Sequence, residues 1–279
     1  MQKNDLRLSR ILKTKRTPKI TKEPLEKLYD TYNRREYISP DPLQFLWDYK
    51  ESGDREIVGL IASSLAYGRV AQILKSVSAV LGRIGKPSSF VKKTSLPDMR
   101  KAFSGFRHRF STGNDIAGML FSAQNALNKY GSLESCFIAG MNNAHGEMLS
   151  SMASFVKELR LDCCIYAGNL LPCPSRGSAC KKLNLFLRWM VRKDKVDPGV
   201  WTNVPASMLI IPLDTHMDNI CRTLGITRRK QANLKTAVEI TNFFRQMNPD
   251  DPVKYDFALT RLGIINTGEL QNFLDRWRV

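Results

Sequence analysis

Apolar residues recur at three- and four-residue steps through residues 54–84, and this spacing constrains the fold more than any other feature of the sequence. It places aliphatic side chains on one face of an α-helix, which must be buried against other helices. Gly68 interrupts the run and predicts a bend or a split into two helices. The apolar set is Ile57, Leu60, Ile61, Leu65, Val70, Ile73, Leu74, Val77 and Leu81.

Helical spacing is repeated along most of the chain, whereas the alternation that is typical of strands is scarce. LIIPL at 209–213 is apolar but too short to build a sheet. The sequence therefore predicts an all-α fold without a central sheet. The other segments with helical spacing are 24–37, 115–129, 146–160, 179–192, 215–224, 230–246 and 253–262.

The charge of the chain indicates a polyanionic partner. Lys and Arg number 43 against 26 Asp and Glu, which gives a formal net charge of +17. Each phosphate that such a surface neutralises releases a counterion, so nucleic acid is the first candidate. An anionic membrane surface, or solubility alone, is the alternative reading of the same charge.

Residues 1–22 are basic and poor in large apolar groups, so we expect an N-terminal arm that contacts phosphates, followed by one helical domain over 23–279. The arm lacks the apolar stretch of a secretory signal, and no apolar run approaches the roughly 20 residues that span a bilayer. Six cysteines without a CxxC pair favour reduced thiols over a disulfide framework or a metal cluster. We therefore expect a cytoplasmic protein without a membrane segment.

The most informative stretch is 172–226. In PSRGSACKKLNLFLRWMVRK a turn that contains Gly177 leads directly into an amphipathic helix. The N-terminus of a helix presents unpaired backbone N–H groups and the positive end of the helix dipole, which suits a phosphate. An ordinary helix start with solvated lysines is the alternative. The candidate nucleic-acid contacts here are Arg176, Gly177, Ser178 and Arg188.

Asp214 precedes a second amphipathic helix in LIIPLDTHMDNICRTLGI. It is either a simple N-cap or a carboxylate placed to act on a substrate. His216 is a candidate nucleic-acid contact; it has no ligand-spaced neighbour, so we expect no metal site.

These two stretches together resemble the helix–hairpin–helix DNA glycosylase superfamily. Asp214, Thr215 and His216 match its D-T-H motif, and R-x-L-G follows at 222–225. Gly177 and Lys181 match the hairpin glycine and the lysine just inside the next helix, with Lys182 as the neighbouring possibility. The wider chain is similar to an uncharacterised bacterial family, domain of unknown function 2400, through SSLAYGR, SACKKLNLFLRWMVRKD and DPVKYDFALTRLGI.

The resemblance implies a two-lobed helical fold with a cleft between the lobes. It also implies a DNA base-excision enzyme, a glycosylase with or without AP-lyase activity, that acts on damaged duplex DNA without a metal or organic cofactor. Lys181 or Lys182 would be the amine nucleophile and Asp214 its electrostatic partner. A neighbouring cation and a helix N-terminus both lower the pKa of a lysine, as the nucleophile requires.

The sequence departs from the superfamily at the hairpin, where LPCPSRG replaces the usual L-P-G-V-G. The insert KDKVDPGVWTNVPAS lengthens the stretch between Lys181 and Asp214, as in the archaeal oxoguanine glycosylase branch. The cysteine cluster of the endonuclease III branch does not follow Asp214. These departures keep open a non-catalytic module that docks DNA or RNA on the same scaffold.

A flipped-out base requires a pocket with aromatic walls. The candidates are aromatic residues near the two motifs or in the first half of the chain, and packing in the core is the alternative for each. They are Tyr67, Phe106, Phe110, Trp189 and Trp201.

Overall fold

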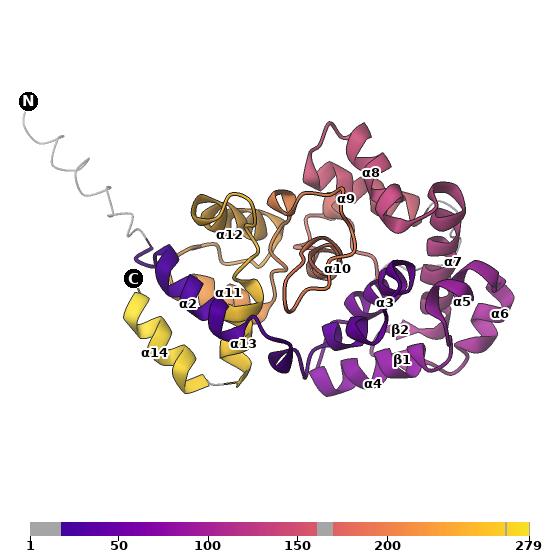
Figure 1. Ribbon diagram of the computed structural model, residues 1–279, viewed down its shortest axis with the longest axis horizontal. Coiled ribbons are helices and arrows are strands. Elements are labelled where there is room, and N and C mark those ends of the chain that lie inside the picture. The colour runs from indigo at the N-terminus through magenta and orange to yellow at the C-terminus, as the bar shows by residue number, and fades with distance from the viewer. Residues whose placement is uncertain (1–17, 161–169, 266, 279) are drawn as a thin grey trace, which may run out of the picture.

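The computed structural model describes residues 18–160, 170–265 and 267–278. These residues form helices with a single two-stranded antiparallel hairpin, which confirms the expected all-α class (Figure 1). The hairpin consists of β1 (Arg107–His108) and β2 (Ser111–Thr112). The α-helices are α2 (Lys22–Tyr32), α3 (Ser52–Ser64), α4 (Val70–Leu81), α5 (Pro87–Lys93), α6 (Leu96–Ala102), α7 (Gly113–Tyr130), α8 (Leu133–Asn143), α9 (Met148–Glu158), α10 (Lys181–Val191), α11 (Thr215–Thr223), α12 (Leu234–Met247), α13 (Asp256–Ile265) and α14 (Thr267–Trp277). The 3₁₀ segments are η1 (Arg35–Tyr37), η2 (Pro42–Asp48), η3 (Pro174–Arg176) and η4 (Ala206–Met208).

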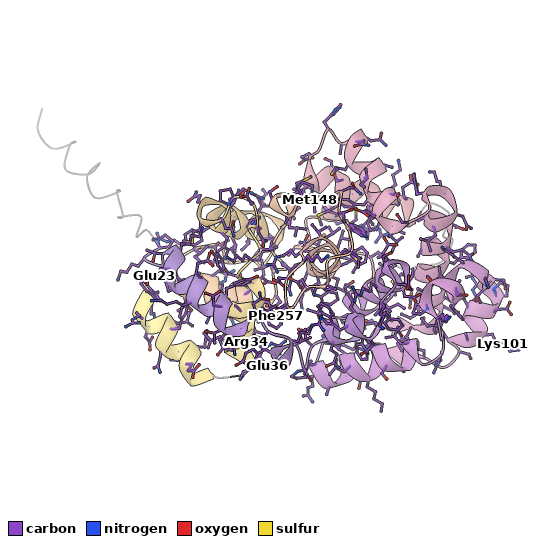
Figure 2. All side chains as sticks on the ribbon, in the orientation of Figure 1. Glu23, Arg34, Glu36, Lys101, Met148 and Phe257 are labelled. Carbon is purple, nitrogen blue, oxygen red and sulfur yellow. The ribbon has the colours of Figure 1, made fainter. Side chains whose placement is uncertain are left out.

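Helix α10 lies near the middle of the molecule, with groups of helices on both sides (Figure 1). It packs on α3. On one side α13 contacts α2, α11 and α14, so the first and last helices of the described chain belong to the same group. On the other side α7 contacts α5, α6 and α8, and α8 packs on α9. The side chains drawn in Figure 2 fill the space between these elements.

The apolar run of residues 54–84 splits as its glycine predicts. Helix α3 ends at Ser64, Gly68 adopts a φ of +97°, and α4 begins at Val70. A positive φ is accessible to glycine without the clash that a Cβ would cause. The turn at Tyr67 and Gly68 faces the N-terminus of α10, since the carbonyl of Ala66 accepts a hydrogen bond from Lys181.

The other predicted helices are present with shifted ends. Helix α7 begins at Gly113, earlier than expected, because Thr112 and Asp115 form a capping box. The segment after Asp41 forms the 3₁₀ helix η2, and the Asp41 side chain accepts a hydrogen bond from the backbone N–H of Leu43. Ile20 is buried and α2 begins at Lys22, so the domain starts before the expected boundary at residue 23. Residues 1–17 of the predicted arm lie outside the described residues.

Two buried arginines hold α10 in place. Arg188 is 3% exposed and donates to Asp197 and Asp256, with Nη2 of Arg188 2.9 Å from Oδ1 of Asp197. Arg192 donates to Asp197 and Asp251. Asp197 is completely buried and joins both arginines. Removing one partner from such a network leaves a buried charge uncompensated, so the network fixes α10 against α13 and against the loop that follows α10.

None of the helices in the described ranges is long and apolar enough to cross a membrane.

Candidate functional site

The turn that precedes α10 has the backbone that its glycine predicts. Gly177 ends η3 in the left-handed region at a φ of +73°, and Cys180 caps α10 at a φ of +50°. Arg176, Gly177 and Ser178 are exposed at this turn. The predicted nucleic-acid contacts at 176–178 are therefore accessible, directly before the N-terminus of α10.

A second basic turn, which sequence reasoning missed, lies against the first. Ser178 pairs with Asn233 in an antiparallel bridge, and the backbone N–H of Leu234 donates to the carbonyl of Gly177 at 3.2 Å. Asn233 caps α12, and the exposed residues 228–230 (Arg-Arg-Lys) precede it. The basic run is visible in the sequence, but its place beside Gly177 depends on one tertiary bridge.

Asp214 is both an N-cap and a member of an ion pair. Its Oδ1 accepts a hydrogen bond of 2.9 Å from the backbone N–H of Met217 at the start of α11. Its Oδ2 lies 3.7 Å from Nζ of Lys181, and the two side chains are 25% and 33% exposed. The fold thus brings together the carboxylate and one of the two lysines that the sequence singled out.

Lys182 points to a different neighbour. Its Nζ lies 4.8 Å from the centre of the Tyr67 ring. Burial, and secondarily the cation of Lys181, lowers the pKa of Lys182 to about 8. A larger share of this amine is therefore neutral near physiological pH than is usual for lysine.

Two cavities, of about 610 Å³ and about 570 Å³, share the wall that holds Lys181 and Asp214. Both volumes are within the range of small-molecule sites. Ala66, Gly68 and His216 also line both cavities. The larger cavity continues along α10 and α13 to residues that include Phe257, which is labelled in Figure 2. The smaller one includes Lys182, Tyr67 and Ser178, and so reaches the turn before α10.

The wall of the larger cavity contains polar groups without partners. Trp189 is 1% exposed, and its indole Nε1 has no hydrogen-bond partner among the described residues. The same holds for Oδ1 of Asp256, whose Oδ2 binds Arg188. Buried polar atoms are normally satisfied, so these two unpaired atoms are exceptions, and both belong to residues that line the larger cavity.

The family described as "Protein of unknown function (DUF2400)" matches residues 41–265. The chain belongs to the DUF2400 family. No curated protein and no solved structure matches the chain.

The DUF2400 match contains all of the residues that line the two cavities except Pro40. The whole-chain similarity that the sequence suggested is therefore confirmed over 41–265. The more specific likeness to the glycosylase superfamily stays a prediction.

Arg188, an expected nucleic-acid contact, is buried, although it lines the larger cavity. Its guanidinium is bound by Asp197 and Asp256, and although burial opposes it, these carboxylates raise the pKa of Arg188 above its ordinary value. A buried cation that is already neutralised by two carboxylates has no charge to offer a phosphate. The helical phase alone could not show this, because its acidic partners are brought in by the loop after α10 and by α13.

The aromatic candidates for the base pocket include core residues, cavity-lining residues and one exposed residue. Trp201 is 3% exposed and donates to Oε1 of Glu56 at 2.7 Å, and Phe106 is also buried, so both belong to the core. Trp189 and Tyr67 line the cavities. Phe110 lines neither cavity and is 73% exposed.

The cysteines and histidines of the described ranges form no metal site. No group of three or more His, Cys, Asp or Glu side chains there has the arrangement of metal ligands. Cys136, Cys173, Cys180 and Cys221 are free thiols. Cys163 and Cys164 lie outside the described residues.

Proposed function

We propose that this DUF2400 protein is a DNA base-excision enzyme, a glycosylase with AP-lyase activity that acts on damaged duplex DNA. The observation that carries the proposal is the distance of 3.7 Å between Nζ of Lys181 and Oδ2 of Asp214, on the wall that two cavities share. An amine and a carboxylate from separate segments converge there on a space large enough for a nucleoside.

The chemistry assigns one step to each group. The ammonium first loses a proton to solvent. The neutral amine then forms a bond to the anomeric carbon of the sugar, the glycosidic bond breaks, and the base leaves with the electron pair and takes up a proton. The amine gives up a proton in the same exchange. The ring oxygen then leaves the anomeric carbon and takes up a proton from solvent, which opens the sugar ring and produces a protonated Schiff base. The carboxylate of Asp214 stabilises the positive charge that develops on the sugar.

Lys181 is the nucleophile that the geometry favours, because its amine lies beside Asp214 and it lines both cavities. Lys182 is the second candidate, and the observation in its favour is its pKa of about 8. Its amine lines only the smaller cavity and lies over the ring of Tyr67. If Lys181 is the nucleophile, Lys182 provides a cation beside it.

The turn at 176–178 supplies the exposed Arg176 side chain for the DNA phosphates, since the backbone N–H groups of Arg176 and Gly177 already donate to Cys173 and Pro174. His216 is exposed in the first turn of α11 and lines both cavities. The exposed basic turn at 228–230 extends this surface, with Arg229 paired to Glu239. Phosphate contacts from two adjacent turns would orient the duplex above the cavities, and binding would fall steeply with salt concentration.

Borohydride trapping tests the proposal. The protein is incubated with duplexes that contain an abasic site or 8-oxoguanine, and borohydride reduces any Schiff base to a stable cross-link. We expect a cross-link with the wild type, its loss in Lys181→Gln and its retention in Lys182→Gln. Lys195→Gln is the matched control, since Lys195 is exposed and lines neither cavity.

Three other outcomes would change the assignment. Loss of the cross-link in Lys182→Gln alone would move the nucleophile to Lys182. A cross-link that survives both substitutions would exclude both lysines. A wild type that binds DNA but is inert on every lesion tested would contradict the enzyme and leave the non-catalytic docking module.

A further inference from the structure

The β1–β2 hairpin carries the most exposed large apolar side chain of the described residues. Phe110 is 73% exposed at the tip, between the paired residues His108 and Ser111. A single exposed apolar residue is common on protein surfaces, so exposure alone indicates nothing. Phe110 differs from such a residue because a buried polar network anchors its hairpin and because the hairpin lies next to the cavities.

The hairpin is held rigidly from below. His108 and Ser111 are completely buried. Nδ1 of His108 lies 2.8 Å from Oγ of Ser76, and Nε2 lies 3.1 Å from the carbonyl of Tyr67. The hydroxyl of Tyr67 is 2.8 Å from Oγ of Ser111. The tip therefore cannot fold down over the core without breaking a buried polar network.

The tip also stores backbone strain. Arg109 has a φ of +52°, a region that is strained for a residue with a Cβ. This conformation is held between two anchored residues, and the next residue along the chain is the exposed phenylalanine. Strain that the surrounding structure maintains in this way is typical of functional positions.

The hairpin lies next to the cavities. The side chain of Arg109 covers Gly68, where an added Cβ would be only 3.0 Å from Cδ of Arg109. Gly68 lines both cavities, and Tyr67, which anchors the hairpin, also lies under Lys182. The remaining exposed large apolar side chains of the described ranges are Val70, Ile264 and Ile265, and the first two line the larger cavity.

We propose that Phe110 is a wedge that enters the base stack of duplex DNA beside the nucleotide that moves into the cavity. An apolar side chain inserted at a base step fills the space that the displaced base leaves and offsets part of the cost of unstacking. Arg107 and Arg109 are exposed, both directly before Phe110 in the chain, and supply cations for nearby phosphates. The inference rests on the proposed function, because it takes duplex DNA as the partner.

A duplex that contains a tetrahydrofuran abasic analogue, with 2-aminopurine at the adjacent position, tests the wedge. Fluorescence of 2-aminopurine rises when the base loses its stacking partner. We expect the wild type to bind the duplex and raise the signal, and Phe110→Ala to bind about tenfold or more weakly and to lose the signal. Phe110→Trp should retain both. The same oligonucleotide as a single strand should be bound equally by the wild type and by Phe110→Ala.

Ile265→Ala is the matched control, because Ile265 is 49% exposed and lines neither cavity. It should behave as the wild type does. Phe110 makes no contribution to the core, so a thermal melt of Phe110→Ala should match that of the wild type.

Unchanged duplex binding and fluorescence in Phe110→Ala would overturn the wedge. Equal weakening on duplex and single strand would overturn it in favour of a stacking platform for single-stranded nucleic acid. The wedge and the enzyme can fail separately. A Phe110-dependent signal without any borohydride cross-link would contradict only the enzyme, whereas a cross-link with a Phe110-independent signal would contradict only the wedge. A wild type that binds no DNA would contradict both.

Discussion

Asp214 performs two tasks that a single substitution can separate. Its Oδ1 caps α11 through Met217, and its Oδ2 faces Lys181. Asparagine caps a helix as well as aspartate does, but it carries no charge. Asp214→Asn should therefore keep the helix start and remove only the electrostatic partner, whereas Asp214→Ala removes both.

The geometry sets the cost in stability. Two unit charges 3.7 Å apart near a protein surface attract each other by about 4 kcal/mol before any cost of desolvation or ordering is counted. The side chains are 33% and 25% exposed, so water screens the pair, and its net contribution is about 0–1 kcal/mol. We expect Asp214→Asn to lower the free energy of unfolding by at most ~1 kcal/mol, and Asp214→Ala to lower it by about 1 kcal/mol more.

Excision should respond far more strongly than stability. Removing a group that stabilises charge in a transition state typically costs 10²–10³ in rate, which is about 3–4 kcal/mol. Urea unfolding of both variants gives the stability, and single-turnover excision from a lesion-containing duplex gives the rate. DNA binding by Asp214→Asn should match that of the wild type.

Wild-type excision by Asp214→Asn would refute the catalytic role of the carboxylate and leave Asp214 as a helix cap. Equal losses of stability in Asp214→Asn and Asp214→Ala would show that asparagine does not cap α11. The two variants would then not separate the loss of the charge from the loss of the cap.

Three further predictions follow from charge and burial. Asp197→Ala should lower the free energy of unfolding by about 3–5 kcal/mol in a urea titration, because it leaves Arg188 and Arg192 short of a fully buried counter-ion; a loss below 1 kcal/mol would contradict the buried network. In the folded protein the pKa of Lys182 is lowered to about 8, whereas in the unfolded chain Lys182 keeps its proton to a higher pH. Burying the charged amine therefore lowers the free energy of unfolding fully below pH 8, and this destabilisation is relieved as the pH rises above 8. The wild type should therefore gain about 1–2 kcal/mol relative to Lys182→Met between pH 7 and pH 10, after allowance for partial exposure, and parallel stability curves for the two proteins would contradict this. Deleting residues 2–17 should weaken DNA binding and flatten its dependence on salt, since this stretch is rich in Lys and Arg; unchanged binding at low salt would exclude it as a phosphate contact.

Helix ends followed from the sequence only where a local signal marks them. Gly68 separates α3 from α4 because a positive φ suits glycine, and Asp214 starts α11 because its side chain reaches the N–H of Met217. Helices α5, α6, α8 and α14 were missed. Helices α5 and α6 have seven residues each, which gives too few turns for a clear apolar period. The β1–β2 hairpin was missed for the same reason, because two-residue strands show no alternation.

In the candidate site, too, only the features that depend on local sequence could be predicted. The Gly177 turn, the two lysines and Asp214 could be found from local chemistry, since each lies at the start of an amphipathic helix. Their convergence could not, because nothing local relates one helix start to the other. The buried state of Arg188 and the place of residues 228–230 beside Gly177 were likewise out of reach, since each depends on segments distant in the chain.

The sequence by itself determined the helical class, the basic character and the residue types at the two motifs, because periodicity, charge and capping act within a few neighbouring residues. Only the tertiary structure decided that Lys181 faces Asp214, that Arg188 is neutralised by Asp197, and that Phe110 is exposed beside the cavities. These depend on how the buried faces of distant helices pack, and on which side chains that packing leaves without a partner. A helix start or an exposed turn has the same local sequence wherever it lies in the fold, so its chemical role is determined by the neighbours that folding brings to it.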